Sequence, residues 1–155
     1  MFKIRPALHS DIPRIQELLF SLNQMHLDNL PGDYNSPEDI QEKIKTNEFI
    51  DNEKHVAVVA CSQDRVIGFL LGNIWERKSW ILQNRSIANI IDLAVEEEFQ
   101  GNGIGKKLLT EFEQQVKSIG VEEIWVEIYA FNERAVAFYQ SCGIKPLIHI
   151  GQKKL

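Results

Sequence analysis

The feature that most constrains this chain is a glycine-rich segment in its second half. Glycine occupies every second position of the sequence QGNGIGK, from Gln100 to Lys106. The segment follows a strand-like run that ends at Val95 and precedes a run of helical spacing that ends at Ile119. The first N–H groups of a helix lack partners inside it, and the helix dipole adds partial positive charge there. Because glycine has no side chain, it leaves these N–H groups open, and such a turn can bind an anion such as a diphosphate.

A glycine-rich turn without a ligand is the alternative interpretation. Each glycine weakens a helix start by about 0.5–1 kcal/mol relative to alanine, so the pattern favours a ligand. Two common phosphate-binding motifs do not fit. The dinucleotide pattern GxGxxG would need its third glycine at Lys106, and a P-loop would need glycine at Gln100 and Ser or Thr at Lys107. The pattern that remains is Q-x-x-G-x-G.

The apolar periodicity along the chain predicts six strands and four helices. Strands are expected over residues 2–7, 55–61, 65–75, 87–95, 124–129 and 146–154, with a hairpin turn at 62–64. Helices are expected after Ser10-Asp11, after Ser36-Pro37, and over 104–119 and 133–141. The order β-α-α-β-β-β-α-β-α-β indicates an α/β fold, with a mixed, mostly antiparallel sheet and helices on both faces.

Length and composition narrow the class of protein. A chain of 155 residues fits one domain, expected over 1–155. The net charge of -5 argues against nucleic-acid binding. Cys61 and Cys142 form neither a disulfide framework nor a metal-ligand spacing with the histidines. No stretch is apolar enough to span a bilayer, so we expect a cytoplasmic protein that binds neither a membrane nor a metal.

The glycine segment resembles the coenzyme A signature of the GCN5-related N-acetyltransferase (GNAT) family, Q/R-x-x-G-x-G/A between a strand and a long helix. A second block supports the resemblance, because N-x-x-A-x-x-F-Y from Asn132 to Tyr139 matches the family pattern. Cys142-Gly143-Ile144 follows it, with Ile144 where the family usually has Phe. The opening Ile4-Arg5-Pro6-Ala7 also resembles the usual family start. Together these features cover nearly the whole chain in the family's order.

The resemblance implies a site for acetyl-CoA as co-substrate. Backbone N–H groups of the glycine loop would hold the pyrophosphate, and the preceding strand would pair with the pantetheine arm. The strands expected at 87–95 and 123–129 would splay apart to admit it, and a backbone N–H would polarise the thioester carbonyl. The cofactor-binding residues implied are Leu93, Ala94, Val95, Gln100, Gly101, Asn102, Gly103, Ile104, Gly105, Lys106 and Asn132.

Tyr139 matches the family's usual general acid, which protonates the departing thiolate. A phenol with an ordinary pKa near 10 suits that task, since the leaving thiol has comparable basicity. The alternative is a core tyrosine that packs beside Phe138. The sequence by itself leaves both roles open.

The general base is less constrained by the sequence. Two carboxylates, Asp92 and Glu127, interrupt apolar strands, and burying either one without a partner would cost free energy. Glu127 resembles the strand glutamate that acts as base in the ribosomal-protein alanine acetyltransferase branch, and it precedes Tyr139 by the same spacing as in that branch. Proton loss through water to several groups is the alternative. The polyamine acetyltransferase branch uses a glutamate where this chain has Ile91, which counts against its mechanism. Asp92 is either catalytic or a paired structural carboxylate.

The resemblance therefore implies an N-acetyltransferase that moves an acetyl group to a primary amine by direct transfer in a ternary complex. The loop at residues 24–36 would line the acceptor site, including His26, Asp28, Asp33 and Tyr34. The acceptor itself, a small molecule or a protein amine, does not follow from the sequence. A non-catalytic acyl-CoA sensor and a longer acyl donor are the alternatives. Dimerisation is common in the family, so a homodimer is an assembly to test.

Overall fold

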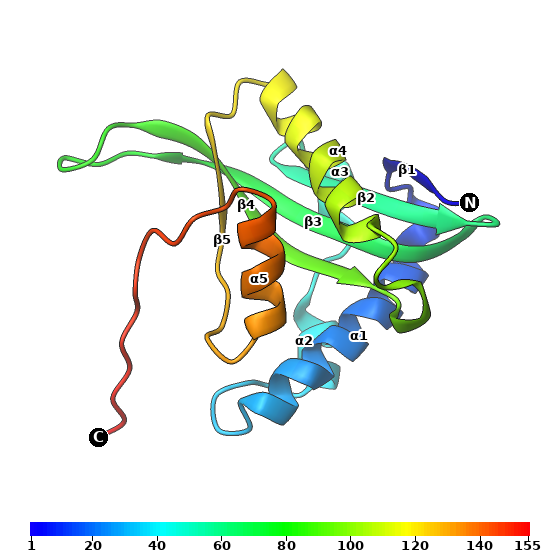
Figure 1. Cartoon of the computed structure of the whole chain (residues 1–155), viewed down its shortest axis with the longest axis horizontal. Coiled ribbons are helices and arrows are strands. Elements are labelled where there is room, and N and C mark those ends of the chain that lie inside the picture. Colours follow the sequence, from blue (N-terminus) through cyan, green and yellow to red (C-terminus); the bar gives the residue numbers. More distant parts are fainter.

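Five strands form one sheet in the order in which they occur along the chain (Figure 1). The computed structural model describes all residues from Met1 to Leu155. The strands are β1 (Lys3–Pro6), β2 (His55–Ser62), β3 (Arg65–Arg77), β4 (Arg85–Val95) and β5 (Glu123–Val126). The helices are α1 (Ile12–Asn29), α2 (Pro37–Lys43), α3 (Glu48–Asp51), α4 (Ile104–Ser118) and α5 (Glu133–Ser141), with 3-10 turns at His9–Asp11 and Glu97–Phe99.

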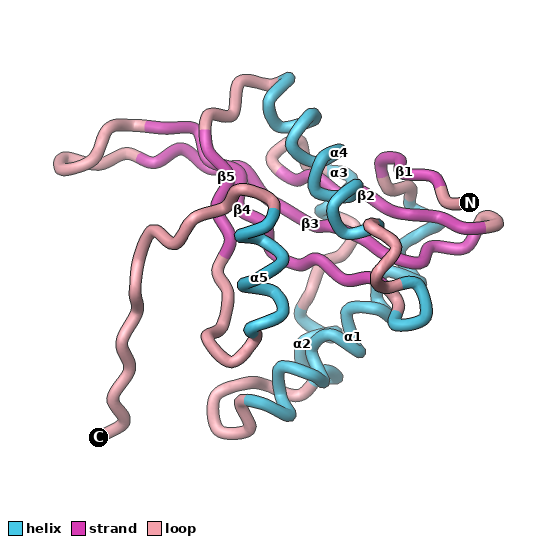
Figure 2. The backbone as a smooth tube through the Cα atoms, viewed as in Figure 1, coloured by secondary structure: helices cyan, strands magenta, loops and turns pink.

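The sheet is mixed, as the sequence predicted. Strands β1 to β4 are paired antiparallel, whereas β4 and β5 are parallel. Strands β4 and β5 can be parallel because α4 connects them. This helix returns the chain to the end of the sheet at which β4 starts, and β5 begins there. The tube view shows this crossover, with α4 between the two strands in the chain path (Figure 2). The predicted α/β class is confirmed.

Two hydrophobic cores lie on opposite faces of the sheet, and strand alternation separates them. In β2, Val56, Val58 and Ala60 face the core shared with α4 and α5. The intervening Ala57, Val59 and Cys61 face the core shared with α1 and α3. Because side chains alternate along a strand, one apolar run fills both cores. Helices α4 and α5 lie on the near side of the sheet in Figure 1.

A glycine in β3 allows α4 to approach the sheet closely. A Cβ atom built on Gly72 would lie 2.6 Å from ring carbons of Phe112 and 2.9 Å from the Asn89 carbonyl oxygen. Phe112 is fully buried on α4. The close approach fixes α4 over the strands and, with it, the position of the glycine loop at the start of the helix.

Several local predictions are confirmed. The Ser36 side chain accepts a hydrogen bond from the backbone N–H of Asp39, and Pro37 occupies the first turn of α2. The β2–β3 hairpin turns on Gln63 and Asp64, both with positive φ, which suits the tight turns that join antiparallel strands. These elements follow from residue types whose preferences act over a few neighbouring positions.

The strand expected over residues 146–154 is wrong. Gly143, with φ of 89°, turns the chain away after α5, and the segment that follows runs outward without pairing to the sheet (Figure 1). Its apolar side chains remain in solvent, Ile148 being 65% exposed. The β propensity of Leu147 and Ile148 is real, but a strand also needs a neighbouring strand for its backbone hydrogen bonds.

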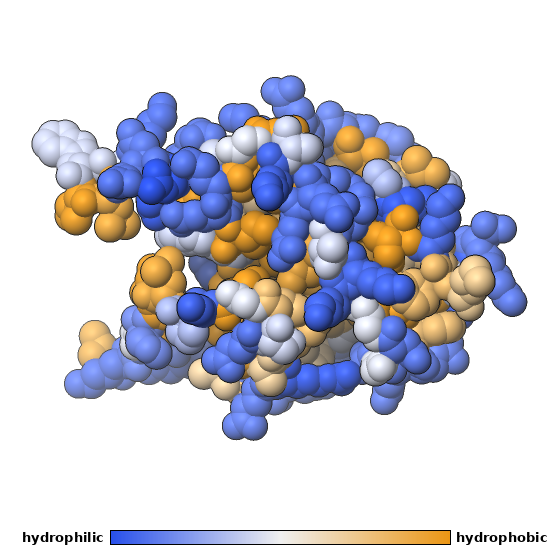
Figure 3. All heavy atoms as spheres, turned by 45° about the horizontal axis from the view of Figure 1, so that its top comes forward, coloured by the Kyte–Doolittle hydropathy of each residue, from blue (hydrophilic) through white to orange (hydrophobic).

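The β3–β4 hairpin projects well beyond the body of the molecule. Its outer end carries the exposed side chains of Trp80, Ile81 and Leu82, and apolar side chains are visible at this extremity in Figure 3. The tip belongs to neither core. A substitution there changes an exposed aromatic ring without touching either helical layer.

Candidate active site

The parallel strands β4 and β5 separate part-way along the sheet. Their pairing runs from Ile87–Glu123 to Ile90–Val126 and stops there. Beyond Ile90, β4 continues to Val95 with β3 as its only strand partner. Its other edge therefore has backbone groups that β5 does not pair. The expected divergence of the two strands is confirmed, and Leu93, Ala94 and Val95 lie on the strand that forms one side of it.

A β-bulge lies at the point of divergence. Leu71 pairs with Asp92, but the adjacent Gly72 pairs with Ile90, so Ile91 is an extra residue in β4. Bulges interrupt the regular ladder and redirect nearby side chains. Asp92 pairs with Leu71, which belongs to the core on the α1 side, so Asp92 points toward α1 rather than α4.

The glycine loop joins β4 to α4 in the conformation that its sequence requires. Gly101 and Gly103 have φ values of 79° and 74°, and a Cβ atom on either would meet nothing within 4 Å. Glycine is therefore favoured at these two positions by the backbone conformation, because a side chain would have enough space there. The six N–H groups from Gly101 to Lys106 donate no hydrogen bond within the protein. The loop thus presents consecutive free donors at the positive end of a helix.

Gln100 and Gly105 fit this loop to its surroundings. The Gln100 side-chain amide donates a 2.7 Å hydrogen bond to the Val95 carbonyl, which ties the loop to the end of β4. A Cβ atom on Gly105 would lie 3.3 Å from the Phe138 ring and 3.7 Å from Leu93. The first turn of α4 therefore packs closely against both α5 and β4.

The side chains around the loop differ in their roles. The Asn102 amide donates hydrogen bonds to the carbonyls of Phe99 and Gln100, at 3.1 and 3.3 Å. The Lys107 ammonium lies over the Phe2 ring, 4.7 Å from its centroid, whereas Lys106 forms no ion pair. A cavity of about 330 Å³ borders the loop, and Asn102 and Ile104 are among its lining residues.

Tyr139 lies on α5 with only 7% of its surface exposed. Burial raises the pKa of its phenol above the ordinary value, and the negative charge of Asp92 adds to the increase. Its hydroxyl forms no hydrogen bond to another protein group, although the ring packs 5.0 Å from Phe138, centroid to centroid. The side chain is thus part of the core, while its hydroxyl remains protonated and available.

Glu127 lies outside the strand in which it was expected, whereas Asn132 stands directly before α5. Glu127 was expected inside a strand, but β5 ends at Val126 and the Glu127 side chain is exposed. The Asn132 side chain caps α5, accepting a 3.0 Å hydrogen bond from the Ala135 N–H. That contact occupies its oxygen and leaves its amide N–H groups free.

Asp92 is partly buried and forms no ion pair or hydrogen bond with the protein. Its interpretation as a paired structural carboxylate is therefore wrong. Burial raises its pKa, and the nearby His26 partly offsets that increase. An unpaired carboxylate in such surroundings costs free energy, which is a recognised feature of functional sites.

The structure adds two aromatic residues to those that the sequence indicated. His26 and Tyr34 were expected at the acceptor loop, and in the structure they contact Tyr129 and Phe131 from the segment between β5 and α5. The only sequence signal for this cluster was the aromatic content of a short loop.

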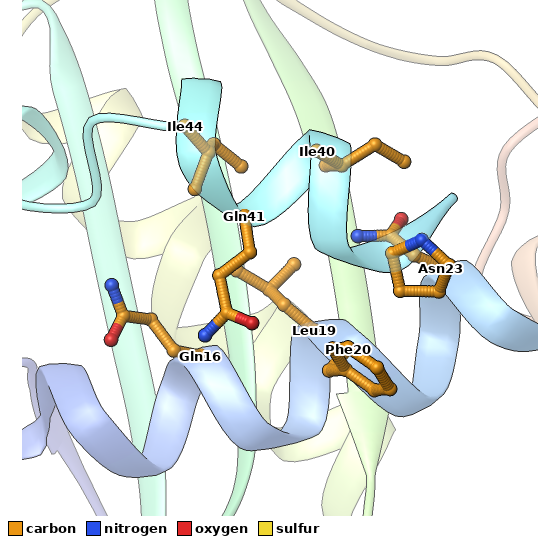
Figure 4. Close-up of a pocket in the computed structure, with 8 residues that line it drawn as sticks. Gln16, Leu19, Phe20, Asn23, Ile40, Gln41 and Ile44 are labelled. Carbon is orange, nitrogen blue, oxygen red and sulfur yellow. The ribbon is translucent and has the colours of Figure 1, made fainter. Parts of the chain in front are cut away.

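The cavity between α1 and α2 (Figure 4) has a volume of about 10 Å³, which is no more than one water molecule needs.

None of the helices combines the length and the apolarity that crossing a bilayer requires. The long α1 helix carries charged and polar residues along its length and buries one side, including Ile15, Leu18 and Leu19. It is an amphipathic helix that packs on the sheet.

Comparison with solved structures supports the fold and the family. A mutant of the BH1408 protein from Bacillus halodurans superposes with a TM-score of 0.87 at 23% identity and covers 99% of both chains. This likeness shows the fold. An acetyltransferase from Vibrio fischeri gives a TM-score of 0.67 at 27% identity, covering 81% of this chain and 94% of that one.

Sequence relatives share part of the chain. The [ribosomal protein bS18]-alanine N-acetyltransferase of Salmonella typhimurium is 29% identical over 91 residues, 59% of this chain and 55% of that protein. N-alpha-acetyltransferase 30 of Schizosaccharomyces pombe is 30% identical over 94 residues, 61% of this chain and 53% of that protein. The matches thus span about half the length of these curated relatives.

The family model matches most of the chain and includes the site described above. It extends from residue 19 to residue 144, which takes in the divergence of β4 and β5, the glycine loop and Tyr139. With a fold and a family match that agree, this chain belongs to the acetyltransferase (GNAT) family.

Proposed function

We propose that this protein is an acetyl-CoA-dependent N-acetyltransferase, built on a single domain over residues 1–155, that acetylates a primary amine by direct transfer in a ternary complex. The observation that carries the proposal is the row of six free N–H groups beside the unpaired edge of β4. Both features belong to a chain whose family transfers acyl groups to amines. The names of the curated relatives point in the same direction.

The donor side of the site fits a coenzyme A diphosphate. Residues Gln100 to Lys106 form a loop whose free N–H groups suit phosphate oxygens. Lys106 adds positive charge, and its ammonium group forms no ion pair within the protein. Leu93, Ala94 and Val95 offer an unpaired strand edge to the amide groups of pantetheine. The free amide N–H groups of Asn132 are available to the same arm.

Bound acetyl-CoA supplies a thioester, and transfer forms a C–N bond while the C–S bond breaks. Tyr139 is proposed to give its phenolic proton to the leaving sulfur. Its raised pKa keeps the phenol protonated at neutral pH, which is the form that a general acid needs. The attacking nitrogen must lose a proton as well. Glu127, exposed just beyond β5, can accept it directly or through water.

A direct-transfer enzyme makes a clear kinetic prediction. Release of the coenzyme A thiol is measured with acetyl-CoA and a panel of amines that includes a peptide with an N-terminal alanine. Initial rates at several concentrations of both substrates should give intersecting double-reciprocal lines, because both substrates must be bound before chemistry. Parallel lines would indicate an acyl-enzyme intermediate and contradict the proposal.

The same measurements separate an enzyme from a sensor. Calorimetric titration with acetyl-CoA should show binding, and amine-dependent thiol release should accompany it. Binding without release across the panel would favour the non-catalytic acyl-CoA sensor. Faster release with propionyl-CoA than with acetyl-CoA would instead assign a longer acyl donor.

A further inference from the structure

Four aromatic side chains form a cluster where two loops meet. The His26 and Tyr34 rings are stacked, with centroids 5.1 Å apart and an interplanar angle of 16°. Tyr129 and Phe131 meet the His26 ring edge-on, at 5.6 and 6.0 Å. His26 is therefore the centre of a group drawn from the end of α1, the loop after it, and the segment between β5 and α5.

This aromatic cluster (His26, Tyr34, Tyr129 and Phe131) is separate from both hydrophobic cores. In Figure 1 the segment leading into α5 lies beside the end of α1 and the loop that follows. Tyr129 is 49% exposed, so part of its ring is open to solvent. Tyr34 is held in place by its hydroxyl, which donates a 3.1 Å hydrogen bond to Asn23.

Asp92 adds a negative charge beside these rings. It lies on β4 at the point where β5 separates, and it points toward the α1 side of the sheet. Burial raises the pKa of Tyr34, and the charge of Asp92 raises it further. Asp92 also acts on Tyr139 in this way. One unpaired carboxylate therefore lies within electrostatic reach of both the aromatic cluster and the candidate general acid.

A primary ammonium group already contacts this side of the molecule. The Lys154 Nζ atom, from the C-terminal segment, lies 3.1 Å from an Asp33 carboxylate oxygen. Asp33 precedes Tyr34 of the cluster in the α1–α2 loop. The loop can thus be approached from solvent by an alkylammonium chain.

Aromatic faces and an unpaired carboxylate together favour one class of ligand. Ring quadrupoles attract a cation, most strongly where water is partly excluded, and the apolar stem of an alkylammonium packs against ring carbons. An acceptor that carries phosphate would be repelled by the negative charge of Asp92. The arrangement selects by charge as well as by shape.

We propose that the aromatic cluster and Asp92 form the acceptor subsite, and that it takes amines on an apolar stem that arrive as alkylammonium cations, such as a lysine side chain or a diamine. This inference rests on the proposed function, since it assigns the substrate class of the same site. Asp92 binds the positive charge, and the rings receive the stem.

The test uses 1,5-diaminopentane as the probe and glucosamine 6-phosphate as an anionic amine of similar reach. The wild-type protein should use the diamine and discriminate against the phosphorylated amine. Asp92→Asn and Tyr129→Ala should each raise the KM for the diamine about ten-fold. The control Trp80→Ser, at the distant hairpin tip, should stay within about two-fold of wild type. The KM for acetyl-CoA should not change in any of these variants.

Calorimetric titration of the diamine into protein saturated with coenzyme A separates this inference from the transferase proposal. Diamine binding that is lost in Asp92→Asn supports the subsite even if no amine releases thiol. Acetyl transfer to the diamine with unchanged KM in Asp92→Asn refutes the subsite and leaves the transferase intact. Preference for glucosamine 6-phosphate, or absence of diamine binding, also overturns it. A merely structural role for the rings would lower the melting temperature and weaken acetyl-CoA binding to the same degree.

Discussion

The side-chain amide of Gln100 is hydrogen-bonded to the carbonyl oxygen of Val95, at 2.7 Å. The bond spans the connection between the strand proposed to pair with pantetheine and the loop proposed to hold the diphosphate. It keeps the loop's free N–H groups in a fixed position relative to the strand edge. The donor site therefore depends on a contact that touches neither the thioester nor the amine.

Replacement of Gln100 should weaken the donor site without stopping chemistry. Gln100→Ala removes a hydrogen bond worth about 0.5–1.5 kcal/mol, so the acetyl-CoA dissociation constant should rise about two- to thirteen-fold. Gln100→Glu should bind more weakly still, because it cannot donate and places negative charge beside the diphosphate. Calorimetric titration gives both constants. Equal affinity in all three proteins would show that the bond does not organise the loop.

Gly103 is at the N-terminus of α4 with a φ of 74°. Gly103→Ala introduces no clash, since nothing lies within 4 Å of the added Cβ. It still forces alanine into a left-handed conformation, which costs about 1–2 kcal/mol. We expect lower stability in urea unfolding and weaker acetyl-CoA binding. Gly151→Ala is the matched control, because Gly151 has equal space and no positive φ.

Tyr139→Phe separates the chemical role of Tyr139 from its packing role. The ring stays in the core and the lost hydroxyl has no protein hydrogen bond, so unfolding should be little affected. If Tyr139 is the general acid, kcat should fall about 100-fold, at the low end of the usual range for such catalysis, with acetyl-CoA affinity retained. Wild-type turnover in this variant would remove the role.

The pH profile of kcat offers a second test of Tyr139. Burial and then the charge of Asp92 raise its pKa, so the phenol stays protonated to higher pH than an exposed tyrosine. The acid form is the active one, and it is therefore retained when pH rises through the ordinary value of about 10. We expect no descending limb from this group below that pH. A descending limb near pH 8 that disappears in Tyr139→Phe would show that the pKa of Tyr139 is not raised in the protein.

Prediction from sequence succeeded where the determinants are local. The cap at Ser36 and the turn at Gln63 depend on neighbouring residues, and both agree with the structure. The position of Glu127 depends instead on where β5 loses its pairing with β4, which no local pattern specifies. The contact between His26 and Phe131 also could not be predicted from the sequence, since tertiary packing brings together segments that are far apart in the chain.

The strand predicted at residues 146–154 is wrong because local propensity does not specify whether a strand has a partner. Alternation and β-branched residues describe a segment that could pair, but pairing depends on a free edge within reach. After Gly143 the chain leaves the sheet, and its apolar residues stay exposed. The glycine loop was predictable because both its conformation and its free donors arise within seven consecutive residues.

The N-terminal segment contains a pair of residues whose effect on stability depends on pH. Asp11 is 6% exposed and accepts hydrogen bonds from Arg5, at 2.6 and 2.9 Å, and from the Leu8 N–H, at 2.7 Å. Burial by itself would raise the Asp11 pKa, but these hydrogen bonds outweigh it and lower the pKa. The carboxylate therefore stabilises the fold above about pH 4, its ordinary range, and the contribution is lost as pH falls through the lowered value.

Asp11→Asn should therefore cost about 2 kcal/mol at pH 7, measured by urea unfolding. The difference from wild type should shrink as pH falls below the ordinary carboxyl value of about 4. Asp39→Asn is a suitable control, because the Asp39 carboxylate is exposed and unpaired. A difference between Asp11→Asn and wild type that stayed constant with pH would show that ionisation of Asp11 is not responsible.

Asp92 should behave in the opposite way. Burial raises its pKa, with His26 partly offsetting the effect, so its ionised form opposes folding at neutral pH. The penalty is present above the raised pKa and disappears as pH falls below its unfolded value. Asp92→Asn should thus be as stable as wild type or more stable at pH 7, with the difference narrowing toward pH 4. Urea unfolding across this range measures it. A carboxylate that opposes folding, and whose removal impairs only the use of alkylammonium acceptors, is explained by its function. A less stable Asp92→Asn at pH 7 would instead show that Asp92 stabilises the fold.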